Sequence, residues 1–149
     1  MKRNIILLVE DHAGDVELAV RAARKSNPCN EVVVAADGME ALDYLFGTGK
    51  YAGQEPSAVP DLILLDLNLP RVDGLAVLAR LRADERTRRI PVAILTGTRD
   101  ERTVVSSHDL GANRFIVKPV DVAKFAATAV QLGLYRLIAD QSDERRGGR

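Results

Sequence analysis

One stretch of the chain, residues 61–70, constrains the fold more than any other. Residues 62–65 are all apolar, Asp66 follows them directly, and Asn68 and Pro70 come next. A run that is apolar at every position indicates a strand covered on both faces, as in the middle of a parallel sheet. A carboxylate at the end of such a strand is unfavourable unless a partner satisfies it. The groups that meet Asp66 are therefore the main question about this chain.

Strand-like and helix-like segments alternate along the sequence. β-Branched and apolar runs predict the strands, and apolar residues at helical spacing predict the helices. The predicted strands are 5–9, 32–34, 62–65, 92–95 and 114–117. The predicted helices are 16–25, one capped by Asp37, one opening at Asp73, one at about 101–110, and a last helix capped by Asp121 that carries Phe125, Ala129, Leu132 and Tyr135. Five alternations predict an α/β fold with a parallel sheet and right-handed crossovers.

The composition limits the class of protein. The chain has 149 residues, which suits one domain. Basic and acidic residues balance at 21 each, so the net charge favours neither nucleic acid nor a membrane surface as partner. No apolar run reaches the ~20 residues of a membrane span. Cys29 is the only cysteine, so a reducing cytoplasm is expected. We expect one domain over residues 1–140 and a flexible charged tail over 141–149.

Polar residues follow four of the five predicted strands. In a parallel sheet the C-terminal ends of all strands lie at one edge, and ligands bind there, where the strand order reverses. In the flavodoxin-like order 2-1-3-4-5, with helices on both faces, the first and third strands are neighbours. This order would bring together the polar residues Glu10, Asp11, Asp66, Asn68, Thr96 and Lys118.

The chemistry of this set points to phosphoryl transfer. Three carboxylates at one place cannot all remain ionised without a cation. Lys118 supplies one positive charge, and Mg²⁺, which takes carboxylate and water ligands, suits the remainder. An aspartate beside both cations is set up to attack phosphorus and form an acyl phosphate. Taken singly, each residue has a plainer role, such as a turn or a helix cap, and only their joint occurrence carries this prediction.

Four motifs resemble the receiver domain of two-component response regulators, and as a set they are specific. They are Glu10-Asp11, Asp66-Leu-Asn68-Leu-Pro70 with Asp73-Gly74, Leu95-Thr96, and Phe115-Ile-Val-Lys118-Pro119. The similarity runs from about Ile5 to Ile138. A long loop over 47–60, the 66–74 stretch and Arg89-Ile-Pro-Val92 resemble a narrower group, the single-domain regulators encoded beside bacterial phytochromes.

The resemblance implies a role for each residue of the predicted site. Asp66 would accept a phosphoryl group from a phosphohistidine of a sensor histidine kinase, with a bacteriophytochrome as one candidate. Asp11, Asp66 and the main-chain carbonyl of Asn68 would bind Mg²⁺, and Glu10 would act through water. Lys118 would pair with a phosphoryl oxygen.

The resemblance also implies a switch. Thr96 would turn toward the phosphoryl group, and Phe115 would move inward behind it. Many relatives carry a tyrosine at this place. Because Phe115 has no hydroxyl, only its packing can signal. The peptide bond between Lys118 and Pro119 is expected to be cis, against a base rate of about 5–6% for such bonds.

Two other classes of protein fit the sequence less well. A magnesium-dependent hydrolase of the haloacid dehalogenase type also forms an aspartyl phosphate, but it needs an acid where this chain has Asn68. A flavodoxin-like cofactor carrier needs a glycine- and hydroxyl-rich phosphate loop where Glu10 and Asp11 would repel phosphate. We therefore expect a stand-alone phosphoacceptor without an effector domain, which catalyses only its own phosphorylation and dephosphorylation and is not a metabolic enzyme.

The end of the predicted last helix suggests a homodimer through the fifth helix and the surface beside it. Leu132, Leu134, Tyr135, Leu137 and Ile138 would fall on more than one helical face. A helix packed on one sheet needs a single apolar stripe. The apolar side chains outside that stripe would be exposed to water, and exposed apolar patches often mark a protein interface. The alternative is that part of this run covers the core of the domain itself.

Overall fold

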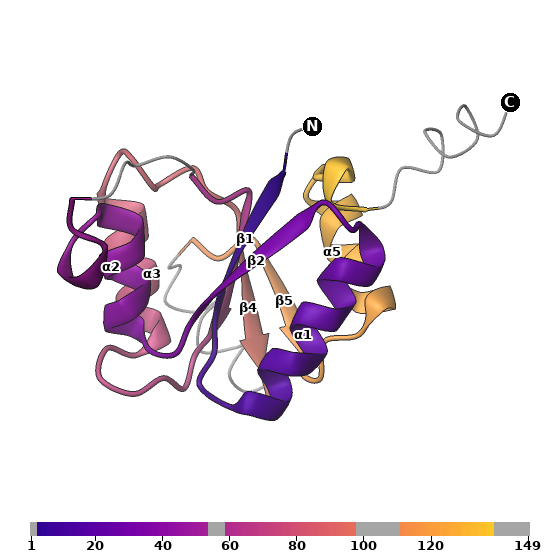
Figure 1. Ribbon diagram of the computed structural model, residues 1–149, viewed down its shortest axis with the longest axis horizontal. Helices are drawn as coiled ribbons and strands as arrows, with labels where there is room; N and C mark the ends of the chain where they lie inside the picture. The colour runs from indigo at the N-terminus through magenta and orange to yellow at the C-terminus, as the bar shows by residue number, and fades with distance from the viewer. Residues whose placement is uncertain (1–2, 54–58, 98–110, 139–149) are drawn as a thin grey trace, which may run out of the picture.

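The computed structural model describes residues 3–53, 59–97 and 111–138, and these form a five-stranded parallel sheet with helices on both faces (Figure 1). The strands are β1 (Asn4–Val9), β2 (Asn30–Ala35), β3 (Leu62–Asp66), β4 (Val92–Thr96) and β5 (Arg114–Val117). Their order in the sheet is β2-β1-β3-β4-β5, and all neighbours are parallel. The predicted flavodoxin-like fold is confirmed.

Helices cover the sheet in two layers. They are α1 (Ala13–Ser26), α2 (Gly38–Phe46), α3 (Gly74–Ala83) and α5 (Val122–Gln131), with short 3-10 turns η1 (Gly49–Tyr51) and η2 (Tyr135–Leu137). Helices α2 and α3 lie against one face, and α1 and α5 lie against the other (Figure 1). The predicted helix at about 101–110 and the predicted tail lie outside the described residues. No helix in the described part of the chain is long and apolar enough to cross a bilayer.

The strand sequences build both layers because successive side chains of a strand point to opposite faces. Leu7 and Val9 of β1 pack in the core under α2 and α3. Ile6 and Leu8 of the same strand pack in the core under α1 and α5. Every residue of β3 and β4 is buried, as predicted for central strands apolar on both sides.

Side-chain caps fix where the helices begin, at the C-terminal edge of the sheet. Asp37, Asp73 and Asp121 each accept a hydrogen bond from the backbone N–H three residues further on. Each cap satisfies an N–H that has no partner within its helix. The predicted starts of α2, α3 and α5 are therefore confirmed.

The first helix begins earlier than predicted, at Ala13 rather than Val16. The residue that caps it is His12, whose Nδ1 accepts a hydrogen bond of 3.3 Å from the backbone N–H of Asp15. Histidine is not among the usual capping residues, which is why the predicted helix began only at Val16. The earlier start puts Asp15 in the first turn of the helix.

The prediction that the last helix continues to Tyr135 is wrong. Helix α5 ends at Gln131, and Gly133 adopts a φ of 73°, which glycine tolerates and other residues resist. The chain then turns back, so that Leu134 and Leu137 are 7% and 0% exposed, while Tyr135 is 65% exposed. The apolar run mainly covers the core of the domain, and a second apolar face on a continuous helix does not exist.

Candidate functional site

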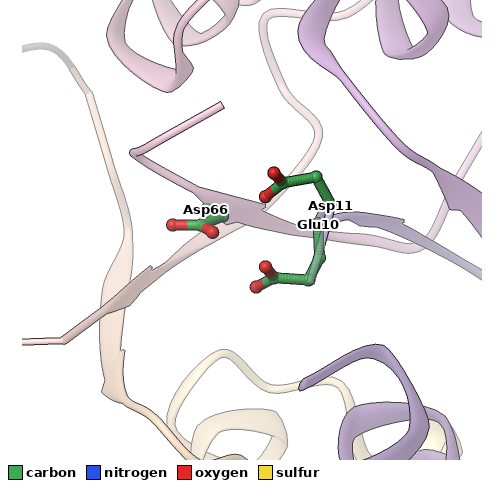
Figure 2. Close-up of side chains that lie close together, drawn as sticks. All are labelled: Glu10, Asp11 and Asp66. Atoms are coloured by element: carbon green, nitrogen blue, oxygen red, sulfur yellow. The ribbon is translucent and has the colours of Figure 1, made fainter. Parts of the chain in front are cut away.

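Three carboxylates meet at the C-terminal edge of the sheet, where β1 and β3 lie side by side (Figure 2). Glu10 and Asp11 follow β1, and Asp66 is the last residue of β3. One oxygen of each lies within 4.8 Å of one oxygen of the others. Glu10 and Asp66 are only 1% and 2% exposed, whereas Asp11 is exposed. Two buried carboxylates therefore share their site with one that reaches solvent.

Lys118, which follows β5, supplies positive charge to this cluster. Its Nζ lies 3.2 Å from Asp66 Oδ2 and 3.5 Å from Glu10 Oε1. It also lies 3.4 Å from Oδ2 of Asp15, which the sequence analysis did not include in the site. Burial lowers the pKa of Lys118, but the three carboxylates outweigh burial and raise that pKa overall. The ammonium therefore stays charged at neutral pH. The bond from Lys118 to Pro119 is cis.

Glu10 responds differently to the same surroundings. Burial raises the pKa of Glu10 to about 7, and Asp66 adds to the increase. The backbone N–H of His12 donates to Glu10 Oε2 at 3.1 Å and acts in the opposite direction, as does Lys118. One ammonium is thus not enough for the carboxylates that surround it. The site favours either a proton on Glu10 or a further cation.

The donor set fits a hard divalent cation. Glu10, Asp11 and Asp66 each offer one carboxylate oxygen, and neither sulfur nor imidazole belongs to this group in the described residues. Mg²⁺ prefers such oxygen ligands together with waters. The backbone N–H of Asn68 donates to Asp66 Oδ1 at 3.1 Å, so the main chain of Asn68 lies beside the carboxylate. These residues are the ones that could hold Mg²⁺.

Thr96 ends β4, the strand beside β3, and it is fully buried. Within the described residues its Oγ1 has no hydrogen-bond partner. A buried hydroxyl without a partner is unfavourable by about 1–3 kcal/mol. A group that offered an acceptor at this edge of the sheet would remove that penalty. Phe115, on β5, is half-buried against the core under α2 and α3.

The loop after Asp66 is held by two contacts that the sequence analysis missed. A Cβ on Gly74 would lie 2.4 Å from the carbonyl oxygen of Asp66, so only glycine lets α3 begin this close to β3. Arg71, whose φ is 65°, donates two hydrogen bonds of 3.0 and 2.9 Å to Asp37. The first contact carries a sequence signal, since Asp73-Gly74 is part of the motif; the second has none.

Residues 6–130 match the response regulator receiver domain family. The chain belongs to this family. The receiver domain is 40% identical to response regulator Rcp1 of Synechocystis sp. over 114 residues, which is 76% of each chain. The predicted family is confirmed, and its members signal rather than act as metabolic enzymes.

Solved structures of response regulators resemble the receiver domain closely. The bacteriophytochrome response regulator AtBRR is 47% identical with a TM-score of 0.83, over 90% of this chain and 95% of that one. The Mn²⁺-bound form of Rcp1 is 34% identical with a TM-score of 0.68, over 90% of this chain and 88% of that one. These relatives support the narrower resemblance to the phytochrome-associated group.

Proposed function

We propose that this receiver domain accepts one phosphoryl group on Asp66 from a sensor histidine kinase, in a phosphorelay that depends on Mg²⁺. The observation that carries the proposal is the way Asp66 is held. Oδ2 lies 3.2 Å from the ammonium of Lys118, and Oδ1 accepts a hydrogen bond of 3.1 Å from the Asn68 N–H. The carboxylate is buried and oriented, yet it shares its site with the solvent-exposed Asp11.

The residues of the site suit in-line transfer. An oxygen of Asp66 attacks the phosphorus of a phosphohistidine, the P–N bond breaks, and its electron pair leaves with the imidazole. Lys118 pairs with a phosphoryl oxygen and so stabilises the negative charge that develops there. Asp11 and Asp66 would hold Mg²⁺ directly, with the carbonyl of Asn68 as a further ligand, and Glu10 would act through water. When bound, Mg²⁺ supplies positive charge that offsets the charge on the transferred group.

The same geometry supports a switch at Thr96. In the unphosphorylated protein its buried hydroxyl has no partner within the described residues. A phosphoryl oxygen on Asp66 would offer an acceptor, and the movement of Thr96 toward it would leave space for the half-buried Phe115. A ligand shifts an equilibrium between two conformations only by binding one of them more tightly. Here the hydrogen bond from the Thr96 hydroxyl to the phosphoryl oxygen is the proposed source of that difference.

The proposal is tested by intact-mass measurement after incubation with acetyl phosphate. With Mg²⁺ we expect the added mass of one phosphoryl group on the parent protein, and none after removal of Mg²⁺ by a chelator. Asp66→Asn should show no addition. Asp61→Asn is the matched control, because Asp61 precedes the same strand at the opposite edge of the sheet and pairs with Arg136. Normal phosphorylation of Asp66→Asn would refute the assignment.

The proposal extends to the partners of the receiver domain. The kinase would be a histidine kinase, with a bacteriophytochrome as the first candidate to test, given the phytochrome-associated relatives. The output would be a protein contact or onward phosphate transfer, without nucleic acid. A cytoplasmic location is part of the proposal and rests on the single cysteine.

We also propose a homodimer through the surface of α5 and η2. The apolar side chains that remain exposed there are Val122, Val130 and Tyr135, at 41%, 47% and 65%. Sedimentation at micromolar concentration should show a dimer for the parent and a monomer for Val130→Glu with Tyr135→Glu. Val59→Glu is the control, since this 64% exposed side chain lies on the loop before β3. A parent that stays monomeric with and without a phosphoryl mimic would end this proposal.

A further inference from the structure

We propose that Asp15 is a positioning residue that competes with the phosphoryl group for Lys118, and so lowers the affinity of the receiver domain for that group. The inference rests on the proposed function, because it assumes that Asp66 is the acceptor. It concerns a residue that neither the metal cluster nor the phosphoacceptor requires.

The start of α1 places Asp15 where it faces the ammonium. Its backbone N–H is bonded to the cap His12, and its Oδ2 lies 3.4 Å from Lys118 Nζ. The imidazole of His12 also faces this carboxylate, with Nδ1 3.5 Å from Asp15 Oδ2. The Asp15 side chain is 26% exposed, so solvent screens it less than a surface carboxylate. Its position is set by the helix and does not depend on a flexible loop.

The contacts of Lys118 divide into two kinds. Those with Asp66 and Glu10 have hydrogen-bond geometry, at 3.2 and 3.5 Å. The contact with Asp15 is an ion pair alone, at 3.4 Å. Asp15 is also absent from the group of carboxylates, within the described residues, that could share one metal ion. Asp15 therefore acts on the lysine side of the site and not on the metal side.

Two consequences follow for ligands of opposite charge. A phosphoryl group on Asp66 needs Lys118 for one of its oxygens, and the charge of Asp15 both attracts that lysine elsewhere and repels the incoming anion. Removing this charge should tighten binding of an anionic phosphoryl mimic. The same change should weaken the binding of Mg²⁺ alone. The site loses one nearby negative charge, and Lys118 then pairs only with Asp66 and Glu10. A variant that merely loosened the fold would weaken both.

The test measures beryllofluoride binding at saturating Mg²⁺, and separately Mg²⁺ binding, by isothermal titration calorimetry. For Asp15→Asn and Asp15→Ala we expect about three- to tenfold tighter beryllofluoride binding, the range for one partly screened charge. We expect weaker Mg²⁺ binding by a smaller factor. Asp15→Glu, which keeps the charge, should stay close to the parent.

Two comparisons assign the effect to Lys118. Glu17→Gln makes the same charge change on α1, but Glu17 is 73% exposed and pairs with Arg21 at 3.7 Å, so its affinities should match the parent. In a Lys118→Gln background, measured at higher beryllofluoride concentration, Asp15→Asn should have a much smaller effect, because only the direct repulsion of the anion by Asp15 is then removed. A gain of the same size in that background, or an Asp15→Asn variant that matches Glu17→Gln, would overturn the inference. A parent that binds no beryllofluoride would overturn the proposed function as well.

Discussion

Replacing Glu10 with glutamine should stabilise the receiver domain at neutral pH when no divalent cation is present. Glu10 is 1% exposed, and burial raises its pKa from 4.5 to about 7. Between these pH values the folded state binds more protons than the unfolded state, so the free energy of unfolding falls as the pH rises. Glutamine keeps the shape of the side chain and can donate to Asp66, as protonated Glu10 does.

The size of this effect follows from the pKa difference. Each unit corresponds to 1.36 kcal/mol, so the change from 4.5 to about 7 amounts to about 3 kcal/mol above pH 7. Because part of the increase in the pKa of Glu10 comes from its neighbour Asp66 and not from burial alone, we expect about 2–3 kcal/mol of this for the single substitution. At pH 5, where Glu10 in the folded protein is mostly protonated, the advantage should shrink to under about 1 kcal/mol.

The assay is urea unfolding of the parent and Glu10→Gln at pH 5 and pH 8, in the presence of a chelator. Glu40→Gln is a control, because the contribution of Glu40 to stability should depend on pH in the opposite direction. A hydrogen bond from Lys50 lowers the pKa of Glu40, so its stabilising effect is present at pH 8 and lost on acidification. Adding Mg²⁺ should stabilise the parent more than Glu10→Gln, since the cation replaces the proton. The same pH dependence for the parent and Glu10→Gln would refute this reasoning.

Four further substitutions test other parts of the structure. Thr96→Val removes the buried hydroxyl, so the free energy of unfolding of the unphosphorylated protein, measured in urea, should rise by about 1 kcal/mol. The variant should still accept phosphate, but phosphorylation should change its binding to the partner less than in the parent. Gly74→Ala forces a Cβ to within 2.4 Å of the Asp66 carbonyl oxygen, so we expect about 1–3 kcal/mol of destabilisation and slower phosphorylation by acetyl phosphate. Leu137→Ala should destabilise by about 2–5 kcal/mol because the side chain is fully buried, whereas Tyr135→Ala should change unfolding by under about 0.5 kcal/mol.

The sheet and the main residues of the site could be predicted because parallel topology fixes where strand ends lie. Once residues 62–65 indicate a central strand, Asp66 must emerge at the C-terminal edge, and Glu10 must emerge beside it if β1 is the neighbour. The cluster of Glu10, Asp11 and Asp66 has this geometry. Lys118 reaches the same edge from β5, two strands away from β3.

The remaining features depend on contacts that no local pattern records. Helical spacing predicted a last helix through Tyr135, but the left-handed Gly133 ends it, and burial of Leu137 against the sheet decides the path of the chain. The place of Asp15 in the site was not predicted, because its helix starts with a histidine cap and the predicted helix began one residue after Asp15. The pairing of Arg71 with Asp37, far earlier in the chain, has no sequence signal.

The identity of the phosphorylated residue can be read chemically. Borohydride reduces an acyl phosphate to the corresponding alcohol, so an aspartyl phosphate becomes homoserine, which tandem mass spectrometry locates in the sequence. After incubation with acetyl phosphate and Mg²⁺, we predict homoserine at residue 66 alone, and none when Mg²⁺ is left out. Homoserine at Asp11 or at another aspartate, or a phosphorylated protein that yields no homoserine, would contradict the assignment of Asp66 as the phosphoacceptor.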